Sequence, residues 1–156
     1  MFLHLFLISI LAPRALFAYN TLRTRSIDPE RVCQPISIPA CRNIGYNFTR
    51  LPAYTSGPPD QESAASILEE FRPLINTRCS ERLTFLLCST VAPMCTQQVD
   101  TLITSCRSVC SEVKSACLPW LRRASHSWPD LLNCSKFPVK GAQGSLCMDP
   151  SLSDDE

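Results

Sequence analysis

The chain has 156 residues, enough for one domain, and its 15 Lys and Arg nearly balance its 14 Asp and Glu. This balance argues against a nucleic-acid-binding protein, which normally carries a basic excess, and the 45% of hydrophobic residues argues against intrinsic disorder. Ten cysteines, 13 prolines and only 4 glycines indicate a small globular domain that is held by cross-links.

The N-terminal stretch is predicted to be a secretory signal peptide that covers residues 1–18. Residues 2–12 form an apolar run that is too short to cross a bilayer, which needs about 20 apolar residues. Cleavage is expected after Ala18, and no later segment is apolar enough to span a membrane. We expect a flexible lead-in over residues 19–27, a cysteine-rich domain over residues 28–150 and an acidic tail over residues 151–156.

Apolar spacing predicts three helices in the middle of the chain. The first begins after Asp60 as its N-cap, and Pro73 should kink it or end it near Arg72. A shorter helix is expected over residues 80–88, and the longest over residues 99–117, where three cysteines project to one side. Residues 34–39 predict a short edge strand at most, and Trp128-Pro129 predicts a last turn or two.

The cysteines decide how the predicted domain is stabilised. All ten lie beyond the predicted signal peptide, so export to an oxidising compartment predicts five disulfides. A zinc site would favour close Cys-x-x-Cys pairs with His partners, whereas the closest pair here is Cys106 and Cys110, and one His remains after export. The even count leaves no cysteine for a catalytic thiol. The expected fold is therefore a mostly α, small disulfide-rich helical domain with a minor short β element.

Two Asn-x-Ser/Thr sequons are expected to carry N-linked glycans in an exported protein, at Asn47 and at Asn133. At Asn133 the middle residue of the sequon is a presumed disulfide partner, so crowding competes with modification. No catalytic arrangement stands out, because His126 and Asp130 lack a marked nucleophile. We expect no enzymatic activity, no metal and no cofactor.

Short motifs along the chain carry a resemblance to a known family. They are residues 33–36 (CQPI), 45–49 (GYNFT), 71–74 (FRPL), 85–89 (FLLCS), 93–95 (PMC), 106–110 (CRSVC), 128–129 (WP) and 133–138 (NCSKFP). Together with all ten cysteines they resemble the cysteine-rich domain of the Frizzled receptors and the secreted Frizzled-related proteins. The resemblance covers residues 28–150.

The resemblance implies a disulfide pairing, which the residues alone leave open among hundreds of connectivities. The implied pairs are Cys33–Cys95, Cys41–Cys88, Cys79–Cys117, Cys106–Cys147 and Cys110–Cys134.

The resemblance also implies the partner, an acylated Wnt protein, which such domains bind through an apolar groove and a second, protein-to-protein patch. The groove maps onto Glu70, Phe71, Pro73, Thr90, Ala124 and His126. The last three are smaller or more polar than the family usually has, which should weaken capture of the acyl chain. The second patch maps onto Val99, Leu102 and Ile103, which the predicted helix assigns to the core; the two interpretations compete.

Three functional hypotheses follow. The first is an extracellular Wnt-binding domain, either a secreted decoy or the N-terminal ligand-binding part of a Frizzled receptor. The second is an extracellular lipid or sterol carrier that binds free fatty acid in the same groove, and the third is a purely structural module. A weak homodimer is compatible with all three, and none involves nucleic acid or a transmembrane segment of this chain.

Overall fold

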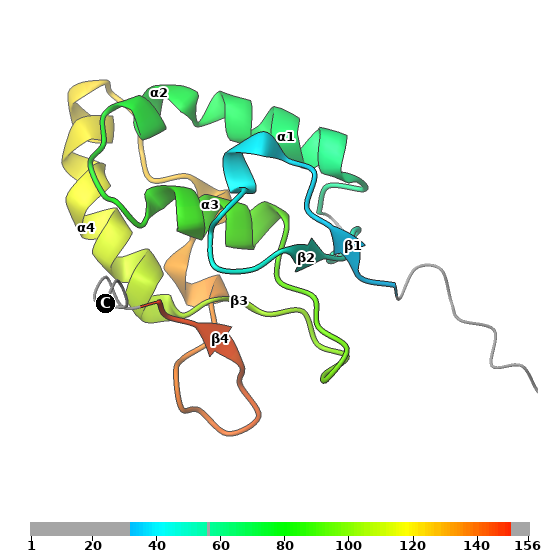
Figure 1. The fold of residues 1–156 in the computed structure, drawn as a ribbon. Coiled ribbons are helices and arrows are strands. Elements are labelled where there is room, and N and C mark those ends of the chain that lie inside the picture. The colour runs from blue at the N-terminus through cyan, green and yellow to red at the C-terminus, as the bar shows by residue number, and fades with distance from the viewer. Residues whose placement is uncertain (1–31, 56, 151–156) are drawn as a thin grey trace, which may run out of the picture.

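The computed structural model describes residues 32–55 and 57–150, and in this part of the chain helices carry the architecture (Figure 1). The α-helices are α1 (Gln61–Glu70), α2 (Arg72–Asn76), α3 (Leu83–Val91) and α4 (Arg107–Arg123). Short 3-10 helices are η2 (Pro39–Cys41), η3 (Asp130–Leu132) and η4 (Cys134–Lys136), and the strands are β1 (Gln34–Pro35), β2 (Phe48–Thr49), β3 (Thr104–Ser105) and β4 (Cys147–Met148). The predicted mostly α fold with a minor β element is confirmed. The predicted signal peptide, lead-in and acidic tail lie outside the described residues.

Helix α3 forms the centre of the core. Leu86, Leu87 and Val91 are completely buried, and Leu83 is 2% exposed. The helix is surrounded by α1, α4, β3, η2 and η3, so nearly every side of it needs an apolar side chain. It begins and ends about three residues later than the predicted helix over residues 80–88.

The predicted interruption of the first helix is confirmed. The carboxylate of Asp60 accepts a hydrogen bond from the Ser63 amide at 2.8 Å, so Asp60 caps α1. Helix α1 ends at Phe71, and Pro73 lies in the first turn of α2. Proline is tolerated there because the first turn of a helix needs no amide donor, whereas inside α1 it would have removed one.

The predicted helix over residues 99–117 is wrong at its N-terminal half. Ile103 exchanges two backbone hydrogen bonds of 2.9 Å with Met94, and β3 pairs in parallel with β4. These extended contacts hold residues 103–105 outside any helix, so α4 begins only at Arg107, with Cys106 as its N-cap. Apolar spacing alone could not distinguish this extended segment from a first helical turn.

Helix α4 also runs six residues beyond its predicted end, through Pro119. It closes with Ser125 in the left-handed region, at φ 60°. The amide of His126 donates to the Leu121 carbonyl at 2.8 Å and that of Ser125 to the Arg122 carbonyl at 3.0 Å. These two hydrogen bonds form a Schellman motif, which satisfies the last carbonyls of the helix without a glycine.

The small β elements fasten the N-terminal segment to the rest of the domain. Strands β1 and β2 pair antiparallel, with Gln34 opposite Thr49, as the predicted edge strand requires. Thr49 forms a further bridge to Met94. Beside it the buried hydroxyl of Tyr46 donates to the Ala92 carbonyl at 2.8 Å.

Five disulfides join the helices and the strands, and they leave no free cysteine among the described residues. The pairs are Cys33–Cys95, Cys41–Cys88, Cys79–Cys117, Cys106–Cys147 and Cys110–Cys134, with Cα–Cα distances from 4.8 to 5.6 Å. They coincide with the pairs that the family resemblance implies. Cys106, Cys110 and Cys117 leave α4 toward three different segments, so the helix is covalently tied along most of its length.

Within residues 32–55 and 57–150, the helices are all too short or too polar to traverse a lipid bilayer.

Candidate functional site

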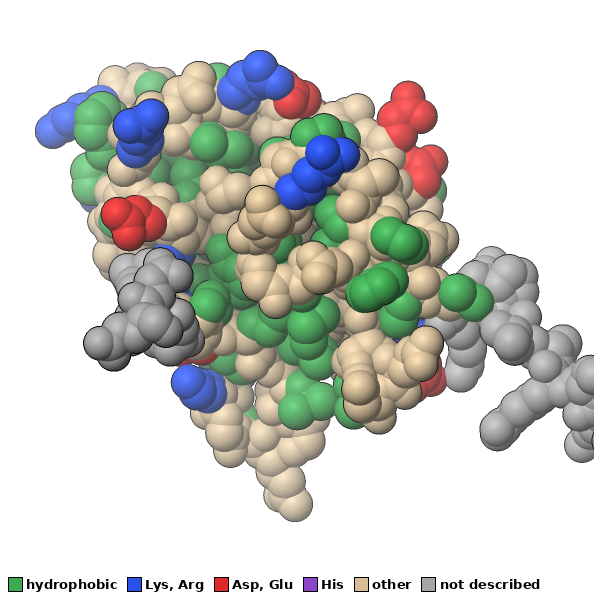
Figure 2. Space-filling view, viewed as in Figure 1, with side chains coloured by type: hydrophobic (Ala, Val, Ile, Leu, Met, Phe, Trp, Pro, Cys, Tyr) green, Lys and Arg blue, Asp and Glu red, His purple; other side chains and the backbone are tan. Residues whose placement is uncertain are grey.

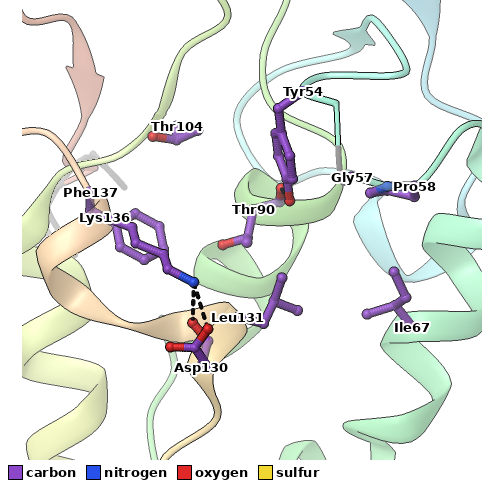
Figure 3. Close-up of a pocket in the computed structure, with 10 residues that line it drawn as sticks. All are labelled: Tyr54, Gly57, Pro58, Ile67, Thr90, Thr104, Asp130, Leu131, Lys136 and Phe137. Atoms are coloured by element: carbon purple, nitrogen blue, oxygen red, sulfur yellow. Dashed lines mark hydrogen bonds and ion pairs between the residues drawn. The ribbon is translucent and has the colours of Figure 1, made fainter.

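A cavity of about 590 Å³ lies between α1, α3 and the η3–η4 segment (Figure 3). Its volume falls within the range of roughly 300–1,000 Å³ that is usual for small-molecule sites. The lining residues come from distant parts of the chain: Tyr54, Gly57, Pro58, Ile67, Thr90, Thr104, Asp130, Leu131, Lys136 and Phe137.

The walls of the cavity are mainly apolar. Ile67 projects from α1, and Leu131 of η3 lies across the opening from it (Figure 3). Phe137 and Pro58, both buried, close the sides. This lining is suited to an alkyl or other apolar group, because burying such a group releases water from both surfaces.

Tyr54 and Gly57 form one rim of the cavity. The Tyr54 hydroxyl points toward α3 and lies 3.5 Å from the Thr90 carbonyl oxygen (Figure 3). Burial raises the pKa of Tyr54, which the positive charge of Lys136 opposes. A Cβ atom at position 57 would lie 2.8 Å from the Tyr54 ring, so glycine is what allows the ring to lie over this loop.

The opposite edge of the cavity is polar. The Lys136 ammonium donates to the Asp130 carboxylate at 2.8 Å and to the Asp130 carbonyl at 3.0 Å. The hydrogen bond from Lys136, followed by its charge, lowers the pKa of Asp130. Both side chains are largely exposed, so the ion pair can exchange partners with a bound polar group at little cost.

Of the six predicted groove residues, Thr90 alone lines this cavity. Its hydroxyl donates to the Leu86 carbonyl at 2.7 Å, so the polar atom is already satisfied by the helix. Phe71 is half-buried at the junction of α1 and α2 and contacts the core. Glu70 and Pro73 are exposed beside it, and the exposed Ala124 and His126 follow the end of α4.

The residues of the predicted second patch do not form one exposed surface. Ile103 is only 8% exposed, and Leu102 is half-buried. Val99, also half-buried, lines a separate open hollow with Arg50 and Asp100, which form an ion pair at 3.1 Å. A second hollow is lined by Phe48, which is 48% exposed, and by the half-buried Met94.

Both predicted glycan-bearing asparagines are exposed. Asn47 directly precedes β2, and its carbonyl accepts a hydrogen bond from the Ile36 amide at 2.9 Å. The side chain of Asn133 is engaged, because its Oδ1 accepts from the amide and hydroxyl of Ser135 at 3.1 and 2.9 Å. A glycan would join the Nδ2 atom of Asn133, next to the Cys110–Cys134 disulfide.

Most of the cavity residues escaped sequence reasoning because they lie in loops and 3-10 turns. Leu131, Lys136 and Phe137 follow no helical or strand period, and Tyr54 precedes a loop that the sequence marks only by its Gly and Pro residues. Ile67 could be placed on a helix face from the sequence, since it belongs to the apolar face of α1. In the described part of the chain, no three His, Cys, Asp or Glu side chains are grouped so that they could hold a metal ion.

A small helical domain that is cross-linked by five disulfides and hollowed by an apolar cavity has the architecture of an extracellular ligand-binding domain. The family model described as "Fz domain" matches residues 33–141. The chain belongs to this family and carries a Frizzled-type cysteine-rich domain, which is a non-enzymatic receptor domain.

Proteins that are similar in sequence to most of the chain agree with this assignment. The chain is 46% identical to Frizzled-10 of Gallus gallus and 45% identical to Frizzled-10 of Homo sapiens, in each case over 136 residues, 84% of the chain. It is 43% identical to Frizzled-9 of Homo sapiens over 127 residues, 78% of the chain. The matches span only 23% of the Frizzled-10 relatives and 21% of the Frizzled-9 relative, so the chain corresponds to one part of those receptors.

Among solved structures, the crystal structure of the Smoothened cysteine-rich domain is similar, with a TM-score of 0.53 and 23% sequence identity. The likeness covers 71% of this chain and 96% of the Smoothened domain. It shows that the two share a fold.

Proposed function

We propose that this domain binds acylated Wnt proteins outside the cell, with the acyl chain held in the cavity between α1, α3 and the η3–η4 segment. It would act either as a secreted modulator of Wnt signalling or as the ligand-binding part of a Frizzled receptor. The apolar cavity of about 590 Å³ carries the proposal, because an acyl chain needs a walled apolar space.

The position of the cavity relates it to the groove residues that the family resemblance implies. Ile67 in the cavity wall and Phe71 are four residues apart on the same face of α1, so they are neighbours on the helix surface. We infer that an acyl chain leaves the cavity along α1 and contacts Phe71 next. Thr90, which is both a cavity residue and a predicted groove residue, would meet the same chain.

A carrier of free fatty acid is the second candidate, and the polar edge of the cavity favours it. Lys136 is the one Lys or Arg among the residues that line the cavity, and its exposed ion pair with Asp130 could be exchanged for one with a ligand carboxylate. An acyl chain that is attached to a protein has no such charge, because its carboxyl group forms the linkage. The two functions therefore differ in whether Lys136 contributes to binding.

The test measures binding of acylated Wnt and of the same Wnt made without its acyl chain. Ile67→Ser removes apolar contact from the cavity wall and should weaken binding of acylated Wnt about tenfold, since roughly 1.4 kcal/mol of lost burial corresponds to that factor. Binding of non-acylated Wnt should not change. Equal losses for both Wnt forms would contradict the cavity as the acyl site.

Leu146→Ser is the matched control, because Leu146 is 50% exposed in the loop before β4 and lines none of the described cavities. It should bind both Wnt forms as the wild type does. Lys136→Gln separates the two candidate functions: it should leave acylated Wnt binding intact and weaken binding of free palmitate only if the domain is a fatty-acid carrier.

A further inference from the structure

The C-terminal half of α4 and the turn that follows it carry positive charge without any carboxylate. Residues 113–128 contain one Lys, two Arg and one His and no Asp or Glu. Glu112, just before this stretch, is already paired with Arg82 at 2.7 Å. The domain is nearly neutral overall, so its charge is distributed unevenly, and this end of the molecule is basic.

Two of the basic side chains, those of Lys114 and Arg122, lie on the same side of α4. Lys114 and Arg122 border an open hollow of about 530 Å³ together with Leu118, His126 and Trp128. Lys114, Leu118 and Arg122 succeed each other at intervals of four residues, so they form one row along α4. The row places its two cations about 12 Å apart, at 1.5 Å of rise per residue.

No ion pair within the described residues occupies these cations. Each ion pair of Lys or Arg in that part of the chain involves another residue: Arg50, Arg72, Arg82, Lys136 or Lys140. Arg123, next to Arg122, lies over the ring of Trp120, with 5.4 Å between its guanidinium carbon and the ring centroid. Trp120 is 44% exposed, but it lies about 160° around α4 from Arg122, so the Arg123–Trp120 pair is on another side of the helix than the row.

Figure 1 places the end of α4 at the upper left of the molecule, beside α2, and Figure 2 shows Lys and Arg side chains in this region. The helix dipole explains part of this charge, because Arg122 and Arg123 lie in the last turn of α4, where cations are favoured. That effect fades within the last turn, however, and does not account for Lys114, which lies more than two turns before the end of α4.

We propose that the row of Lys114 and Arg122, with His126 and Trp128 at the same hollow, is a docking surface for a linear sulfated polysaccharide. Arg122 is exposed, Lys114 is half-buried, and the two cations are spread along the helix, which suits a chain with repeated charges better than a single phosphate group. The half-buried Trp128 borders the same hollow, and its ring is suited to packing against a sugar ring. The site is separate from the cavity, with which its hollow shares no residue, but His126, one of the predicted groove residues, borders the hollow.

The experiment measures binding of the full chain to heparin, as the probe polysaccharide, over a range of salt concentrations. Binding that releases counter-ions weakens with salt, and each lost cation contact lowers the slope of log K against log salt by about one. The double variant Lys114→Gln/Arg122→Gln should lower the slope by about two and weaken binding at least fivefold at 0.15 M salt. Thermal melting should change little, because Arg122 is exposed, Lys114 is half-buried, and neither makes an ion pair among the described residues.

The matched control removes the same charge elsewhere, in the double variant Arg42→Gln/Lys140→Gln, whose side chains are exposed and line none of the described cavities. It should retain the wild-type slope. An equal loss in both double variants would overturn the site in favour of diffuse attraction. Absence of heparin binding at 0.15 M salt, or binding to phosphatidylserine vesicles instead of heparin, would also overturn it. Binding of acylated Wnt, measured in parallel, reports separately on the cavity.

Discussion

Phe71 is the residue at which folding and ligand binding are most closely joined. It ends α1, precedes Pro73 in the first turn of α2, and contacts the core while remaining half-exposed. One side of its ring therefore packs against the core, and the exposed side is accessible to a ligand. A substitution there must be read with both a stability and a binding measurement.

We predict that Phe71→Ala leaves the domain folded but lowers its stability by roughly half of the ~3–5 kcal/mol that a fully buried Phe contributes. Binding of acylated Wnt should fall further than the folded fraction does, because the exposed side of the ring is lost. Thermal melting combined with binding to both Wnt forms measures the two effects. Binding that falls only in proportion to the unfolded fraction would assign Phe71 to the core alone.

A second substitution, His126→Phe, introduces an apolar side chain at a position where the family usually has one. His126 is exposed after the end of α4, so the substitution should leave stability unchanged. A gain in affinity for acylated Wnt is expected if the acyl chain reaches this position. Unchanged affinity would limit the groove to the cavity and Phe71.

At the scale of elements, the sequence predicted the parts of the fold that depend on local chemistry. Asp60 and Pro73 act within one turn of their own helices, so the start of α1 and its interruption could be foreseen. The start of α4 could not, because it depends on pairing with Met94 and with β4, which is over forty residues away in the chain. The cavity likewise depends on distant segments, because the loop before α1, helices α1 and α3, strand β3 and the η3–η4 segment build it, and of these the apolar face of α1 is the part that apolar spacing predicted.

Helix α3 is the element on which the core depends most. We predict that Leu86→Ala, at a completely buried position, lowers the free energy of unfolding by about 2–5 kcal/mol through lost burial and the remaining void. Leu146→Ala, at a 50% exposed position, should change it by less than about 0.5 kcal/mol. Chemical denaturation with the disulfides intact provides the measurement, and equal effects at the two positions would contradict α3 as the centre of the core.

At the scale of the whole molecule, an ion-pair network closes the domain. The buried Arg82, before α3, pairs with Glu112 of α4 and with Asp149 just after β4. Asp149 also accepts a hydrogen bond from Ser108 at 2.9 Å. The network thus joins three segments that are distant in sequence, and the loss of either carboxylate would leave a buried guanidinium with fewer partners.

This network makes stability depend on pH. The hydrogen bond from Arg82 is the main cause that lowers the pKa of Asp149 in the folded protein, whereas in the unfolded chain it is about 3.9. The contribution of Asp149 is therefore fully present at neutral pH and is lost as the pH falls below about 4 and through the folded pKa. Denaturation midpoints between pH 7 and pH 2 should fall accordingly.

Asp149→Asn should lower the midpoint at pH 7 and flatten the decline toward acid, because the titrating group is gone. The exposed Asp130, which is paired with Lys136, serves as the control, since exposed ion pairs contribute little to stability. A variant Asp149→Asn that declines as steeply as the wild type would show that other carboxylates cause the acid sensitivity.

The order in which the disulfides overlap along the chain decides what a protease could do to this domain. Three of them overlap in series: Cys33–Cys95, Cys79–Cys117 and Cys106–Cys147. Every peptide bond between Cys33 and Cys147 therefore lies inside at least one covalent ring. A single cut, even in the exposed loop over residues 139–146, opens the backbone but releases no fragment, and the nicked domain stays one molecule until its disulfides are reduced.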